Sequence, residues 1–147
     1  MLFDLVEYNN KHFIFGTLFA LNNRIQCMGD RFYKEITIKQ LFVILILQLF
    51  DDYAPTLKEL SDAAGSSYQN VKQIILKLEK LNIVKLTSDG HDKRKMRIKM
   101  TENCNELLGR YNEKAQQFLN MLFHGITPNE LEITLATLKK MEQNLLD

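Results

Sequence analysis

Two neighbouring groups of side chains in the middle of the chain have the chemistry needed to hold a polyanion. The first is a basic run at residues 93–99, where five of seven residues are Lys or Arg. Cations this close together repel one another unless an anion lies near them. The run alternates with period two, which indicates a β-strand, and Asp89-Gly90 before it is typical of a turn. The sequence therefore predicts a basic hairpin, although a solubilising edge strand would have a similar composition.

The second group lies on one face of a predicted helix just before the hairpin. This polar face carries Gln69, Asn70, Gln73 and Lys77. The opposite face is an apolar stripe at helical spacing, formed by Val71, Ile74, Ile75, Leu78 and Leu81. In the major groove an amide can make two hydrogen bonds to adenine, and lysine can reach guanine or phosphate. Taken alone, such a face is also that of an ordinary solvated helix, but beside a basic hairpin it indicates contact with DNA.

The distribution of charge supports this interpretation. The whole chain has a formal net charge of only +1, but residues 56–100 contain ten Lys or Arg and five Asp or Glu. This segment therefore carries +5 and the remainder −4. A local cationic region on a nearly neutral protein is typical of a polyanion-binding site.

Local signals predict the elements that position these groups. Ser66 is expected to cap the polar-faced helix, with Gln69 in the capping-box position, and Asn82 is expected to end it in a left-handed conformation. A short helix before it opens with a second capping box, Thr56 and Glu59, and Gly65 makes the turn between the two helices. A short helix, a turn with glycine and a longer helix form a helix-turn-helix.

Further helices are predicted on both sides of this motif. Residues 2–28 form a helical segment that is apolar on more than one side, and a second helix, capped by Thr37, runs to about residue 50 and belongs at the centre. After the hairpin, Thr101 caps a helix that reaches about residue 124, Gly125 ends it, and residues 127–130 open a last one. Apolar terminal helices indicate a dimer interface, although packing on their own domain is the alternative.

Several other classes of protein have little support. The sequence shows no signal peptide, and its longest apolar run is too short for a membrane span, so a cytoplasmic protein is expected. Three scattered histidines offer no metal site, and no catalytic motif is present, so we expect no enzyme, metal or cofactor. A redox switch would need a thiol of low pKa: Arg24 near Cys27, or the first-turn position of Cys104, could lower it, but lone cysteines are more often apolar filler.

The order of elements resembles the MarR family of bacterial transcription regulators over essentially the whole chain. The resemblance is most specific in the wing, where Asp92-Lys93-Arg94 is followed by an alternating strand that ends in Met100-Thr101. This sequence departs from the family at Asn82, where glycine is usual. It also departs at Lys72 and Gln73, where a Thr-Arg pair is frequent, and this leaves the operator sequence open.

The resemblance implies a mainly α fold with a small β-hairpin wing. It implies one domain at residues 1–147, with a winged helix-turn-helix at 36–100 flanked by dimerisation helices at 1–35 and 101–147. The implied protein is a homodimeric, sequence-specific regulator of transcription, a repressor on a palindromic operator in double-stranded DNA. A small-molecule effector that releases it is an expectation of the resemblance alone. Arg94 would enter the minor groove, with Asp92 holding its guanidinium, since a narrow A·T-rich groove attracts arginine.

The residues expected to contact DNA come from the helix and from the wing. Those of the helix are Ser66, Ser67, Tyr68, Gln69, Asn70, Lys72, Gln73 and Lys77. Those of the wing are Asp92, Lys93, Arg94, Lys95 and Arg97. The alternative function is a winged-helix module whose basic wing binds an acidic protein and reads no DNA; preference among duplexes separates the two.

Overall fold

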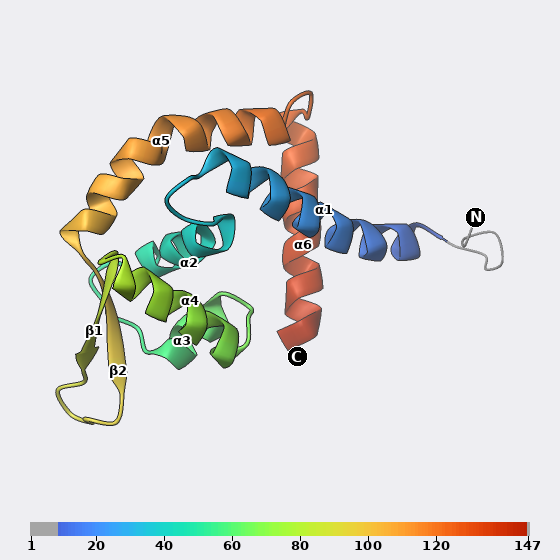
Figure 1. The fold of residues 1–147 in the computed structure, drawn as a ribbon. Helices are drawn as coiled ribbons and strands as arrows, with labels where there is room; N and C mark the ends of the chain where they lie inside the picture. Colours follow the sequence, from blue (N-terminus) through green and yellow to red (C-terminus); the bar gives the residue numbers. More distant parts are fainter. Residues whose placement is uncertain (1–8, 147) are drawn as a thin grey trace. The chain divides into compact units, whose positions relative to one another are not determined.

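The computed structural model describes residues 9–146, which form six helices and one antiparallel pair of strands (Figure 1). In chain order these are α1 (Asn10–Phe32), α2 (Ile38–Gln48), α3 (Leu57–Ala63), α4 (Tyr68–Lys80), β1 (Val84–Ser88), β2 (Met96–Met100), α5 (Glu102–Leu122) and α6 (Pro128–Leu146). The predicted mainly α fold with a β-hairpin is therefore confirmed. The chain divides into two compact units, Met1–Asn112 and Glu113–Asp147. No helix in the described part of the chain is long and apolar enough to cross a membrane.

The predicted caps and turns set most of the helix boundaries. The Thr37 hydroxyl accepts a hydrogen bond from Gln40 N, and the Gln40 side chain accepts one from Thr37 N at 2.9 Å, which completes the capping box of α2. Thr56 and Glu59 form the same box at α3. Gly65 has φ 59° and Asn82 has φ 55°, so both turn the chain in the left-handed region, as expected.

Three predictions about helix ends were wrong. The first described helix has Asn9 as its N-cap and continues to Phe32, beyond the expected end at residue 28; the predicted residues 2–8 lie outside the described residues. The N-cap of α4 is Ser67 and not Ser66, because the Ser67 hydroxyl accepts from Asn70 N at 3.2 Å. Leu81 is the C-cap of α4 and is 46% exposed, so it does not extend the buried stripe.

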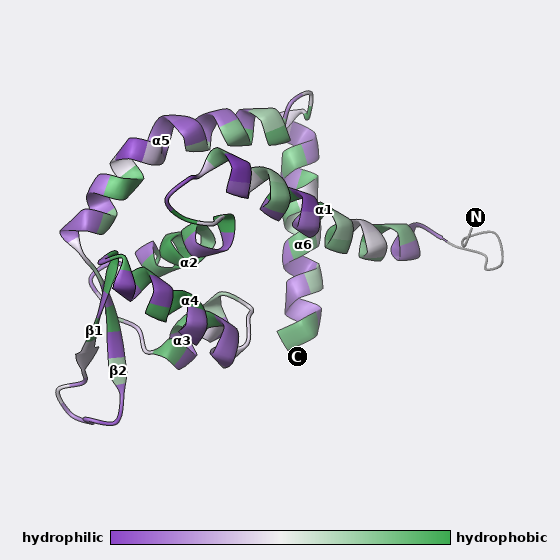
Figure 2. Cartoon of the chain, in the orientation of Figure 1, coloured by the Kyte–Doolittle hydropathy of each residue, from purple (hydrophilic) through white to green (hydrophobic). Residues whose placement is uncertain are grey.

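The core of the first unit joins α2, α3, α4 and the hairpin. Its most deeply buried side chains include Ile44 of α2, Leu60 of α3, Ile75 and Leu78 of α4, and Ile98 of β2. Each such side chain contributes about 1.5–3 kcal/mol through burial. Figure 2 shows the apolar residues of α2 and α4 in green. The expectation of a central α2 holds for one side only, because Phe42 and Leu45 are each 47% exposed.

The hairpin is anchored by a third segment that the sequence did not reveal. Strand β1 pairs with β2 so that Leu86 lies opposite Ile98. On the far side of β2, Ile98 N donates to Pro55 O at 2.9 Å, and Thr56 pairs with Arg97. On the far side of β1, Leu86 N donates to a Glu79 carboxylate oxygen at 3.3 Å. The wing is therefore joined to the loop before α3 and to α4.

The turn between α1 and α2 is closely packed. A Cβ on Gly29 would lie 2.7–2.8 Å from Ile38 side-chain atoms, so this helix position favours glycine. The Asp30 carboxylate accepts from Ile38 N at 2.7 Å and so fixes the start of α2 against α1.

In the second unit, helix α6 opens as the sequence predicted. Gly125 has φ 77°, Thr127 N donates to the Glu130 carboxylate at 2.8 Å, and Pro128 is the first helical residue. These hydrogen bonds from Thr127 lower the pKa of Glu130. No described residue of α6 is buried, and its exposed leucines include Leu135, Leu138 and Leu145.

Candidate nucleic-acid interface

Helix α4 presents the polar face that the sequence predicted. Val71, Ile75 and Leu78 are fully buried on one side. Since successive residues are 100° apart around a helix, Gln69 and Gln73 point most directly away from that buried side. Lys72 lies on one flank of the outward face and Asn70 and Lys77 lie on the other, whereas Tyr68 lies nearer the buried side; all six side chains are exposed.

The N-terminus of α4 is held by two serines with different roles. The Ser67 hydroxyl caps the helix, and the Ser66 hydroxyl accepts from the Asn70 side-chain amide at 2.8 Å. Ser66 is half-buried, whereas Ser67 is exposed. Both serines lie beside the outward face, and their contact with DNA stays a prediction.

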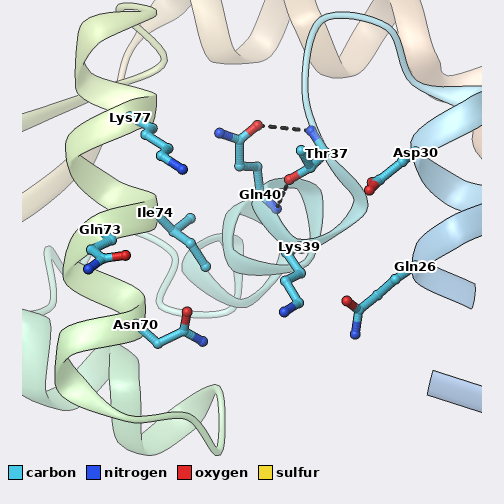
Figure 3. Close-up of a pocket in the computed structure, with 9 residues that line it drawn as sticks. All are labelled: Gln26, Asp30, Thr37, Lys39, Gln40, Asn70, Gln73, Ile74 and Lys77. Carbon is cyan, nitrogen blue, oxygen red and sulfur yellow. Dashed lines mark hydrogen bonds between the residues drawn. The ribbon is translucent and has the colours of Figure 1, made fainter. Parts of the chain in front are cut away.

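One flank of α4 borders a cavity of about 340 Å³ within the first unit (Figure 3). Its α4 wall is formed by Asn70, Gln73, Ile74 and Lys77. The facing walls come from α1 and the start of α2, and their residues are Gln26, Asp30, Thr37, Lys39 and Gln40. Two lysines and one carboxylate line it among several amides, so it suits a small polar anion. Three residues expected to contact DNA therefore also line a cavity.

The wing loop is shaped by two aspartates. An Asp89 carboxylate oxygen accepts from His91 N at 2.8 Å and from Asp92 N at 3.0 Å. Asp92 in turn accepts from Arg94 N at 3.0 Å. One Asp92 carboxylate oxygen therefore orients the main chain of Arg94, and the expected hold of Asp92 on the Arg94 guanidinium in a DNA complex stays a prediction.

The three cations of the loop are available to a ligand. Strand β2 begins only at Met96, so Lys93, Arg94 and Lys95 lie in the loop, and all three are exposed. All three were expected in the strand, but the turn bound by Asp89 and Asp92 takes the place of its first residues.

Arg97 is engaged within the protein, in contrast to its expected role as a DNA contact. Its Nε donates to Asp89 at 2.6 Å, and its Nη1 donates to the Tyr53 hydroxyl at 2.7 Å and to Ala54 O at 3.1 Å. Glu59 accepts from the same Nη1 at 3.4 Å, and the guanidinium carbon lies 5.2 Å from the Tyr53 ring centroid. These contacts engage Nε and Nη1, two of the three nitrogens of the guanidinium, within the protein.

The two carboxylates around Arg97 are held in their charged form. The pKa of Asp89 is lowered by the amides of His91 and Asp92 and by Arg97, the amide of His91 being the largest cause. The pKa of Glu59 is lowered chiefly by the Thr56 amide and the Tyr53 hydroxyl, and to a smaller degree by Arg97. Asp89 is the more enclosed acid, with a side chain only 10% exposed.

Sequence reasoning missed two features of this interface. Leu76 is 41% exposed near the outward face of α4, where an apolar side chain can contact a thymine methyl group. Its position out of phase with the buried stripe was the available signal. The contact of Arg97 with Tyr53 had no signal, because the two residues are 44 positions apart.

Cys104 does not offer a reactive thiol. Cys104 is fully buried, and burial raises the pKa of its thiol to about 11. The alternative that the start of α5 lowers this pKa is therefore wrong, since loss of hydration outweighs the helix dipole, and the favoured interpretation of Cys104 as apolar filler agrees with its burial. Cys27 is exposed on α1.

Solved structures of transcription regulators share this fold, although no protein-family model matches the chain. A MarR protein from Peptoclostridium difficile superimposes with a TM-score of 0.81 at 22% identity, covering 99% of this chain and 92% of the other. A MarR/EmrR family regulator from Acinetobacter gives 0.80 at 20% identity over 94% and 98%. BpsR of Bordetella bronchiseptica, whose DNA binding is regulated by 6-hydroxynicotinic acid, gives 0.76 at 21% over 88% and 98%. The chain thus has the winged-helix fold of MarR-type regulators.

Proposed function

We propose that this chain is a member of the MarR family that binds double-stranded DNA as a homodimer and represses transcription from a palindromic operator. The observation that carries the proposal is the outward face of α4, with its amides and lysines exposed, in the same unit as the exposed basic loop of the wing. Gln69 and Gln73 would read base edges in the major groove, and Arg94 would enter the minor groove beside it.

Selection from a random duplex library tests this proposal directly. Purified protein would be equilibrated with the library at about 0.15 M salt, and the bound duplexes would be sequenced. We expect a palindromic consensus with half-sites about 10 base pairs apart, centre to centre, because two recognition helices must enter successive major grooves. Absence of enrichment would favour the protein-interaction module or a regulator that reads DNA only with a bound ligand, and repeating the selection with a panel of effectors separates these two.

The cavity beside α4 supports release by a small ligand. The side chains of Asn70, Gln73 and Lys77 line it and also belong to the proposed DNA-contacting face. A bound anion would engage these side chains and withdraw them from the bases. The lysines favour an organic anion, and 6-hydroxynicotinic acid, named for BpsR, is a rational first probe.

Ligand release can be tested with a substitution on the wall opposite α4. Lys39 lines the cavity from α2 and is outside the proposed DNA-contacting set. We expect a panel of hydroxylated aromatic carboxylates to contain a compound that lowers operator affinity of the wild type, and Lys39→Ala to blunt this response. Lys34, an exposed cation before α2 that does not line the cavity, supplies the control Lys34→Ala. An equal response of all three proteins would exclude this cavity.

A further inference from the structure

Arg97 lies at the centre of a chain of hydrogen bonds that runs from the helix-turn-helix to the tip of the wing. At one end, its Nη1 contacts Glu59, which completes the capping box of α3, and Ala54 O in the preceding loop. At the other end, its Nε contacts Asp89, whose second oxygen binds the amides of His91 and Asp92. Asp92 then binds the amide of Arg94. Each link joins directly to the next.

The geometry of this chain suits a planar guanidinium. Arg97 donates in two directions, with Nε toward the loop and Nη1 toward Tyr53 and Ala54. Lysine has the same charge but a single ammonium group, which cannot reproduce the fixed fork. The Arg97 side chain is 24% exposed, so solvent competes only partly for these contacts.

We propose that Arg97 is a positioning residue that sets the place of Arg94 relative to α4, and so determines how the protein reads the sequence flanking each half-site. This inference rests on the proposed function. Helix α3 follows directly from the segment at residues 54–56 and shares a core with α4, through Leu60, Val71 and Ile75. A wing loop bound to that segment through Arg97 keeps a fixed offset from α4. Arg94 then meets the minor groove at a defined distance from the bases that α4 contacts.

The structure supplies a matched control for the charge of Arg97. Lys99 lies two residues further along β2, on the same face of the strand by its period of two, and is exposed. Lys99→Met removes one cation near the wing and leaves the Arg97 contacts in place. Arg97→Lys keeps the cation and removes the fork, so the two variants separate charge from geometry.

A first measurement needs no DNA. Amide hydrogen exchange would be followed at residues 89–95 in the wild type, Arg97→Lys and Lys99→Met, with Arg97→Met as a further variant in case lysine partly replaces arginine. We expect exchange at His91, Asp92 and Arg94 to become at least about fivefold faster in the Arg97 variants and to stay unchanged in Lys99→Met, because local opening costs less once a tether is lost. Equal exchange in the Arg97 and Lys99 variants would overturn the inference.

A double-mutant cycle then tests the effect on DNA. Affinities would be measured on the selected operator and on the same half-sites with G·C pairs in the flanks. We expect Arg97→Lys to lose most of the wild-type preference for the selected flank, roughly tenfold if Arg94 reads it. When Arg97→Lys is added to Arg94→Ala, we expect the ratio of affinities for the two flanks to change by less than a further twofold, since the two residues act through one contact.

The possible outcomes separate this inference from the proposed function. Additive losses in the cycle, with a shallower salt dependence for Arg97→Met, would make Arg97 a direct phosphate contact and overturn the inference. Faster loop exchange in a protein that prefers no duplex would support positioning of the wing by Arg97 and contradict the proposed DNA reading.

Discussion

Gln73 belongs both to the proposed DNA-contacting face of α4 and to the lining of the proposed ligand cavity. It points away from the buried stripe and also lines the cavity that faces α1 and α2. Its amide can pair with adenine in two hydrogen bonds, whereas the neighbouring Lys72, on the flank of the outward face, is expected to contribute its charge to a phosphate. The two exposed side chains are adjacent in sequence and should have separable effects.

Replacing Gln73 by alanine should relax base preference more than overall affinity. We expect a loss of about 1–3 kcal/mol on the selected operator and little loss on random duplex. Lys72→Ala should instead weaken both duplexes alike and reduce the slope of log affinity against log salt by about 1. Titrations of both variants at several salt concentrations measure these quantities. Equal losses on both duplexes for Gln73→Ala would make Gln73 a phosphate contact.

Asp89 should make the stability of the fold depend on acid pH. Its pKa is lowered by the His91 amide first and by Arg97 next, so the folded state binds this proton less readily than the unfolded state. The stabilisation is therefore present above the ordinary aspartate pKa of about 3.9 and is lost as pH falls below it.

Asp89→Asn should remove the pH-dependent contribution of Asp89 to the free energy of unfolding. We expect the free energy of unfolding, measured in urea, to fall less steeply between about pH 5 and pH 3 in this variant than in the wild type. Asp62→Asn is the control, because Asp62 forms an exposed pair with Lys58, at 3.0 Å, that contributes little. Parallel pH profiles for wild type and Asp89→Asn would refute the role of Asp89.

At the scale of elements, the predictions that succeeded rest on signals close together in the chain. Thr37 with Gln40, and Thr56 with Glu59, are capping boxes three residues apart, and each begins a helix as predicted. Local signals did not predict the environment of Arg97. The strand period placed it among exposed cations, but Tyr53 and Ala54 bind its guanidinium. That contact depends on how the loop before α3 meets β2, which no local pattern encodes.

The turn between α4 and β1 tests which residue types tolerate a positive φ at position 82. Asn82 has φ 55°, a conformation that glycine adopts freely, asparagine tolerates and β-branched residues strongly disfavour. We expect Asn82→Gly to change stability by less than about 0.5 kcal/mol and Asn82→Val to cost about 1–2 kcal/mol. Thermal and urea unfolding of both variants provide the measurement. A valine variant as stable as the glycine variant would show that the turn can relax.

At the scale of the whole molecule, exposed apolar side chains are the feature that a second copy would explain. On α1, Phe15 is 65% exposed and Phe19 is 62% exposed, and their rings form an edge-to-face pair with centroids 5.1 Å apart. A monomer that kept these rings in water would forgo their burial, which favours the proposed homodimer. The sequence indicated this from the apolar residues of the first segment, although it could not place the surface.

Introducing a charge at Phe19 should weaken the dimer. We expect Phe19→Asp to raise the dimer dissociation constant by about 30-fold or more, equivalent to about 2 kcal/mol, as for a buried aromatic residue at an interface. Thr17→Asp is the control, since it places the same charge on an exposed position on the opposite face of the same helix. Sedimentation equilibrium measures both. A monomeric wild type, or dimers of equal strength, would contradict the assignment of α1 to the interface.

The backbone contacts on either side of the hairpin also affect how the protein behaves at high concentration. Leu86 and Ile98 form one cross-strand pair whose amides point outward, and the protein binds both amides itself, through Glu79 and Pro55. An exposed strand edge with unpaired amides is a template for aggregation. Pro55 has no amide of its own with which to continue a sheet outward. The wing can therefore extend into solvent toward a ligand while the middle of its sheet is protected against pairing with the wing of another molecule.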